Sequence, residues 1–153
     1  MKYLTRQRYQ AIQRDSRKAE RDWQEAGNSY EQEVRLARRH LPASARALSR
    51  LTFHDSIVRA LDPAPRDRIR LVLDSTHNPW GPRVFRLDFL DVVGCSARGP
   101  VVGDWWLYEE FHLHGRGLAL HVLLARSSLV ITASDIILTE LPKTPRPRGR
   151  SPS

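Results

Sequence analysis

The sequence has only one cysteine, Cys95, which excludes an internal disulfide and indicates a reducing compartment. No apolar run approaches the roughly 18 residues of a transmembrane helix, so no membrane span is predicted. The opening segment 1–6 lacks the apolar stretch and the small-residue cleavage site of a secretory signal. We therefore expect a cytoplasmic protein that does not act at a membrane.

Motifs that identify an enzyme are also absent. No G-x-S-x-G or cysteine-centred motif places a nucleophile beside a base. The glycines of segment 94–103 are not followed by Lys-Ser or Lys-Thr, as a phosphate-binding loop requires. Glu109 and Glu110 are adjacent, so on a strand they point to opposite faces and cannot form a glycosidase pair. We predict no catalytic residues and no cofactor, and favour a protein that is not an enzyme.

Positive charge is unevenly distributed along the chain, whose net charge is +8. Residues 1–50 hold 12 Lys and Arg against 6 Asp and Glu, and residues 142–153 hold 4 against none. Residues 51–141 hold 9 against 11. The basic character therefore belongs to the beginning and the end of the chain, and the region between them is nearly neutral.

The first third of the chain predicts helices over 5–51. Apolar or small residues recur every three or four positions from Tyr9 to Tyr30, the spacing of one amphipathic helix face. Thr5 is expected to cap a first helix, and the Gly-Asn-Ser sequence at 27–29 to break it. One long bent helix and a pair of helices both fit this pattern.

From position 55 the hydrophobic period changes to two, which is typical of half-buried strands. A short strand is expected at 55–61 and a loop at 94–103, and the main strands at 69–74, 85–90, 105–114, 118–125 and 129–139. The connections are too short for parallel crossovers, so the strands should pair antiparallel in chain order. We predict an α+β fold with N-terminal helices packed on one face of a C-terminal antiparallel β-meander of about five strands.

These patterns predict one α+β domain over residues 1–141, helical over 5–51 and sheet over 55–141. From 142 to 153 the composition changes to Pro, Arg, Gly and Ser, with nothing apolar to dock on a core. This segment is predicted to be a disordered basic tail.

Three histidines on one predicted hairpin suggest a metal site. His112 and His114 are two apart and share a face, and a turn at 116–117 would place His121 directly opposite His112. Three imidazoles suffice for zinc or a similar ion, with Glu110 as the best fourth ligand. Polar residues on the solvent side of a sheet are the more common explanation of this pattern.

The densest basic patch predicts a surface that could bind nucleic acid. It consists of Arg35, Arg38, Arg39, Arg46 and Arg50. Acidic residues are interspersed among these helices, and the strands lack the basic and aromatic pattern of an RNA-stacking sheet. An ordinary solvated helix face is therefore the stronger interpretation.

Two further places carry candidate side chains. His54 and Asp55 lie where helices give way to strands, and without a nucleophile we expect them to satisfy backbone groups there. Glu109 falls on the face of Phe111 and Val122, so we expect it either at an end of the sheet or in an ion pair with a helix arginine. Glu109 is the strongest single candidate within the sheet.

Several segments are similar to those of one protein family. They are Met1–Arg6 with Tyr9, Leu51–Ser56, Trp106–Glu110, Leu120–Leu124 and Ala133–Ile136. Together they resemble the bacterial domain-of-unknown-function family 4085. The sequence differs in its shorter helical region, in Ser134 where the family tends to carry lysine, and in its tail. The resemblance implies an α+β bacterial protein without an established activity, and directs attention to His54, Asp55, Tyr108, Glu109, His121 and Asp135.

Small size, the lack of a catalytic motif and exposed aromatics favour a protein-interaction module of the immunity or regulatory kind. The aromatics in question are Trp80 and either Trp105 or Trp106. The expected partner is another protein. Nucleic-acid association through the basic helices and tail, and metal binding by the hairpin histidines, are the alternatives.

Overall fold

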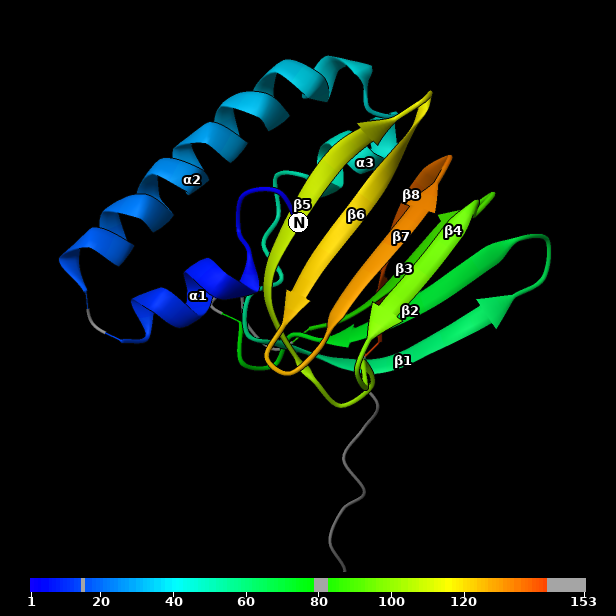
Figure 1. Ribbon diagram of the computed structural model, residues 1–153. Helices are drawn as coiled ribbons and strands as arrows, with labels where there is room; N and C mark the ends of the chain where they lie inside the picture. Colours follow the sequence, from blue (N-terminus) through cyan, green and yellow to red (C-terminus); the bar gives the residue numbers. More distant parts are fainter. Residues whose placement is uncertain (15, 79–82, 143–153) are drawn as a thin grey trace, which may run out of the picture.

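Four helices precede the sheet in the computed structural model, which describes residues 1–14, 16–78 and 83–142 (Figure 1). They are α1 (Arg6–Ile12), α2 (Arg17–Ala37), the short 3-10 helix η1 (Arg38–His40) and α3 (Ala43–Leu48). Thr5 caps α1 as predicted, because its hydroxyl accepts the Arg8 N–H.

The helix break predicted at 27–29 is wrong, because α2 runs through this segment without interruption. The break comes after Ile12, and Ser16 caps α2 by accepting the Ala19 N–H. Glycine inside a helix costs about 1 kcal/mol relative to alanine. Packing of Tyr30 and Val34 against the core outweighs that cost.

The sheet has eight strands among the described residues, where about five were predicted. They are β1 (Ser56–Ala64), β2 (Arg68–Asp74), β3 (Val84–Leu90), β4 (Gly94–Arg98), β5 (Trp105–His114), β6 (Gly117–Leu124), β7 (Ser128–Ala133) and β8 (Asp135–Leu141). All eight pair antiparallel with their neighbours. β4 lies within the segment 94–103, for which a loop was predicted. The strand was not predicted because all its residues are exposed and no apolar alternation marks it.

The strand order β4-β7-β6-β5-β1-β2-β3-β8 departs from a meander. The predicted strand at 129–139 is two strands, since the chain turns a corner at Ser134 between β7 and β8. The Ser134 N–H donates to the Leu90 carbonyl at 2.9 Å, and its hydroxyl to the Asp91 carboxylate at 2.7 Å. β7 then pairs with β4 and β6, and β8 with β3.

The sheet folds over itself into two layers, β4-β7-β6-β5 and β1-β2-β3-β8, as Figure 1 shows. The layers are joined at β1 and β5, which pair only through Ser56 with Trp106 and Ile57 with Trp105. One hydrophobic cluster fills the interior and includes Leu71 and Leu87 from one layer and Leu120 and Ile131 from the other. The helices contribute Val34, Leu41, Ala45 and Leu48 to the same cluster.

Among the described residues, no helix has the length and apolar character to cross a bilayer. Trp105 is 39% exposed and Trp106 is buried, so Trp105 is the exposed member of that pair. Trp80 and the predicted tail from residue 143 onward lie outside the described residues.

Candidate functional site

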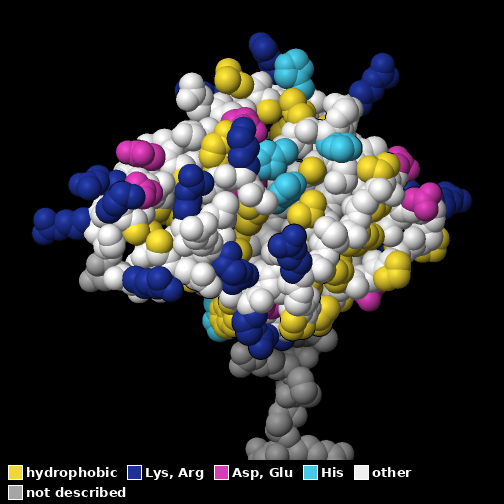
Figure 2. Space-filling model, in the orientation of Figure 1, with side chains coloured by type: hydrophobic (Ala, Val, Ile, Leu, Met, Phe, Trp, Pro, Cys, Tyr) yellow, Lys and Arg dark blue, Asp and Glu magenta, His cyan; other side chains and the backbone are white. Residues whose placement is uncertain are grey.

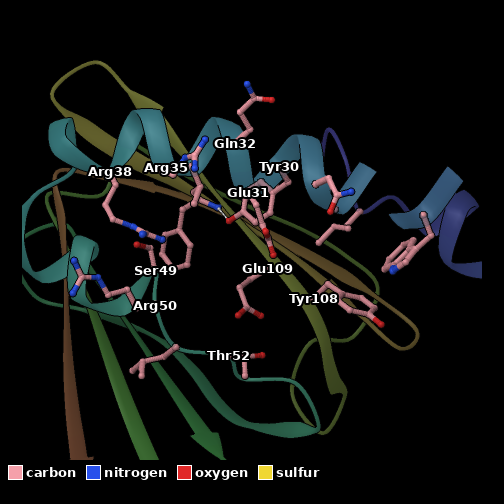
Figure 3. Close-up of a pocket in the computed structure, with 17 residues that line it drawn as sticks. Tyr30, Glu31, Gln32, Arg35, Arg38, Ser49, Arg50, Thr52, Tyr108 and Glu109 are labelled. Carbon is pink, nitrogen blue, oxygen red and sulfur yellow. Dashed lines mark hydrogen bonds between the residues drawn. The ribbon is translucent and has the colours of Figure 1, made fainter. Parts of the chain in front are cut away.

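A cleft of about 1050 Å³ lies between α2 and β5 (Figure 3). It forms because β1 pairs with β5 only at Trp105 and Trp106, so the rest of that β5 edge faces α2. The Tyr30 hydroxyl accepts the Phe111 N–H at 2.8 Å and ties α2 to this edge. The lining side chains include Trp23, Tyr30, Glu31 and Arg35 of α2, Arg38 of η1, Arg50 and Thr52 after α3, and Tyr108, Glu109 and Phe111 of β5.

Arg35, Arg38 and Arg50 form the cationic end of this cleft (Figure 3). None of the three forms an ion pair with another described residue, and the Arg38 Nε is buried without an acceptor there. Three arginines of the sheet are paired with aspartates: Arg59 with Asp74, and Arg70 and Arg86 with Asp88. Arg35 and Arg50 are exposed, so only the Arg38 Nε is a buried donor. Buried donors are normally satisfied, so this group leaves room for an external acceptor.

The Glu109 carboxylate lies in the same cleft, near its centre in Figure 3. An irregularity in the β5–β6 register between Trp106 and Tyr108 brings the side chains of Trp106 and Glu109 onto one face. The Trp106 Nε1–H donates to Glu109 Oε2 at 2.6 Å. Burial raises the pKa of Glu109 to about 7, against the lowering effect of this hydrogen bond.

The ion pair expected between Glu109 and a helix arginine is absent among the described residues, where the indole of Trp106 is the partner instead. The arginines and the carboxylate line one cleft without pairing. Sequence reasoning missed Trp106, because only the β-bulge brings its indole to the carboxylate.

Aromatic rings line the other end of the cleft. The Trp23 and Tyr108 ring centroids are 4.8 Å apart, and His54 stacks on Tyr108 at 5.1 Å. His54 Nε2 lies 3.5 Å from Asp55 Oδ1, and its Nδ1 contacts the Leu107 carbonyl. The Nδ1 contact with the Leu107 carbonyl ties the junction between helices and strands to β5.

The opposite face of β5 carries a second polar cluster, which anchors the N-terminal segment. The fully buried Glu110 accepts the backbone N–H groups of Lys2, Tyr3 and Leu4 at 2.8, 2.9 and 2.5 Å. His112 bridges Glu110 at 2.8 Å and Glu33 of α2 at 3.1 Å. We call Glu110 with residues 2–4 the N-terminal anchor.

The predicted metal cluster is wrong in its geometry. The hairpin turns at 115–116 and not at 116–117, which shifts the pairing of the two strands by two residues. His112 therefore lies opposite Ala119, and His121 lies opposite Glu110. His112 and His121 still lie close, at 4.9 Å between ring centroids, whereas His114 is exposed at the strand end. Figure 2 shows histidines (cyan) gathered on this face. Among the described residues, no group of three or more His, Cys, Asp or Glu side chains could hold a metal ion.

Comparison with known families bears directly on this chain. The family described as protein of unknown function DUF4085 matches residues 2–133 of the 153. The chain belongs to this family. A comparison with curated proteins finds no match.

The DUF4085 match contains the whole cleft and the N-terminal anchor, and it ends before β8. Of the six positions singled out by the resemblance, Tyr108 and Glu109 line the cleft. His54 packs against Tyr108 and lies near Asp55, but neither His54 nor Asp55 lines the cleft. His121 lies on the opposite face of the hairpin.

The remaining candidate residues of this DUF4085 protein lie elsewhere. Asp135 accepts the Ser44 hydroxyl at 2.6 Å, which ties α3 to β8 outside the matched span. The basic patch is divided, because Arg39 and Arg46 do not line the cleft while the other three members do. The spacing of three between Arg35 and Arg38 was the signal for one shared helix face.

His121 should make the protein less stable on acidification. Burial and the nearby positive N-terminus lower its pKa from 6.5 to about 4, so unfolding takes up a proton between these values. We expect His121→Gln to gain free energy of unfolding relative to the wild type as the pH falls from 6.5 to about 4. Urea unfolding of both proteins at several pH values measures this difference. A difference that does not change with pH would contradict the assignment.

Proposed function

We propose that this DUF4085 protein is a non-catalytic protein-interaction module whose cleft receives an acidic segment of a partner protein. The single observation that carries the proposal is the set of three guanidinium groups, unpaired among the described residues, that converge on one cleft. A carboxylate placed between them would accept charge-assisted hydrogen bonds, including one from the buried Arg38 Nε. An immunity or regulatory role fits a protein that acts by occupying its partner.

The acidic residues of the cleft favour a peptide over a nucleic acid. Glu31 and Glu109 line the same space as the arginines and would repel a continuous phosphate backbone. A segment with one or two carboxylates meets less of that repulsion than a chain with one charge per nucleotide. The aromatic end, with Trp23 and Tyr108, offers a surface for an apolar neighbour of the acidic residue.

Binding of a fluorescein-labelled hexaglutamate peptide at low salt tests the proposal by fluorescence anisotropy. We expect the substitution of Arg35, Arg38 and Arg50 by glutamine to weaken binding by at least about tenfold, since three cationic donors are lost. The matched control replaces Arg21, Arg39 and Arg46, which removes the same charge outside the cleft. This control should change binding by less than about twofold.

Three outcomes would overturn the proposal. They are no binding of the peptide to the wild type, an equal loss in the control, and tighter binding of labelled single-stranded or duplex DNA that depends on the cleft arginines. The last outcome would instead support the nucleic-acid alternative.

A further inference from the structure

A carboxyl group in a cleft for acidic ligands poses an electrostatic problem. Glu109 lies among the residues that would surround the incoming carboxylate, and no cation of the described residues is paired with it. Two ionised carboxylates held close together repel each other, so one of them takes up a proton when they are brought together.

We propose that Glu109 binds the partner's acidic side chain as a protonated acid, so that one proton enters the cleft with each carboxylate captured. This inference rests on the proposed function of the cleft. The proton comes from solvent and neutralises the Glu109 carboxylate, and the resulting O–H donates a hydrogen bond to the incoming carboxylate. No covalent bond to the ligand forms or breaks.

The surroundings of Glu109 act on its protonation in opposite directions. The Trp106 indole donates to Oε2 at 2.6 Å and the Phe53 N–H also donates to the carboxylate, and both hydrogen bonds favour the ionised form. Burial is nevertheless the largest influence, and the ligand would add negative charge and exclude more water. A small further rise in the pKa of Glu109 is therefore enough to keep this carboxyl group protonated at neutral pH.

Other charged groups of the cleft have to be separated from this effect. Glu31 and the cationic-end arginines face the cleft from α2, η1 and the segment after α3. His54 does not line the cleft but packs against Tyr108, which does. Arginine does not titrate near neutral pH, whereas histidine as a residue type does and can create a pH dependence of its own. His54 is therefore the group that the experiment has to control.

Proton-linked binding has a defined size and sign. Burial already raises the pKa of free Glu109 to about 7, so below pH 7 the group is mostly neutral and binding costs no further protonation. Above that value each pH unit reduces the fraction of protein that is ready to bind by about tenfold. We expect the hexaglutamate dissociation constant to rise by about tenfold from pH 6 to pH 8.

Isothermal titration calorimetry at pH 8 in two buffers of different ionisation enthalpy measures the proton uptake directly. We expect about one proton per peptide for the wild type and about none for Glu109→Gln. The glutamine keeps an acceptor for the Trp106 indole and should bind with little pH dependence. His54→Gln should retain both the uptake and the pH dependence.

The results distinguish this inference from the proposal on which it rests. A peptide that binds through the cleft arginines without proton uptake overturns the role of Glu109 and leaves the interaction module intact. A wild-type slope that persists in Glu109→Gln and disappears in His54→Gln assigns the linkage to His54 and also overturns it. No binding at either pH overturns the proposed function itself.

Discussion

Glu110→Ala should lower the free energy of unfolding by about 3–5 kcal/mol, the usual cost of removing one partner from a buried charged network. The fully buried carboxylate accepts three consecutive backbone N–H groups from residues 2–4 and contacts His112. Alanine would leave these donors without an acceptor beneath the N-terminal segment, and an unsatisfied buried donor costs about 1–3 kcal/mol. Urea unfolding measures the loss.

Two comparisons make this expectation specific to the N-terminal anchor. Glu140→Ala removes the same group from an exposed pair with Arg83 at 3.7 Å and should change stability by less than about 1 kcal/mol. Amide hydrogen exchange at Lys2, Tyr3 and Leu4 should accelerate in Glu110→Ala before the rest of the chain is affected. Similar stability of Glu110→Ala and Glu140→Ala would contradict this account of the anchor.

Gly117→Ala is expected to be the most damaging small substitution in the sheet, at about 3 kcal/mol. Gly117 begins β6, and a Cβ there would lie 2.2 Å from the Ala133 carbonyl oxygen and 2.9 Å from the Ser134 Cα. Both are backbone atoms at the corner between β7 and β8, so no side chain can rotate away. The strands would have to separate where the chain passes from one layer to the other.

Gly94→Ala is the matched control within the same sheet. Its Cβ would meet only the Thr132 Cβ at 4.0 Å, an ordinary contact, so a change below about 1 kcal/mol is expected. Thermal and urea unfolding of the two variants against the wild type test the difference. Equal stability of Gly117→Ala and Gly94→Ala would show that the corner is not tightly packed.

The candidate site combines residues that were predicted for separate reasons. Glu109 and Tyr108 were singled out on the hairpin, and Arg35, Arg38 and Arg50 as part of a basic patch. Only the fold shows that α2 crosses β5 so that both groups line one cleft. The Trp106 partner of Glu109 could not be predicted, because a β-bulge has no distinct signature in the amino-acid alternation.

The histidines show why a strand pattern predicts a face more securely than a partner. Alternation correctly placed His112 and His121 on one face with Glu110, since a register shift of two residues preserves the face. It could not determine which residues lie opposite each other, because the position of the turn decides that. The same two-residue shift removes the metal cluster and places Glu110 directly opposite His121.

Local patterns in the sequence determined the fold class, the helical beginning, the antiparallel strands and the membership of the DUF4085 family. The structural properties follow from hydrophobic period and short connections, which act between neighbours in the chain, whereas the family membership follows from the similarity of residues 2–133 to the family. The tertiary structure alone decided the corner at Ser134, the two layers of the sheet and the edge strand β4. It also decided the meeting of α2 with β5, because all of these depend on packing between residues far apart in the sequence.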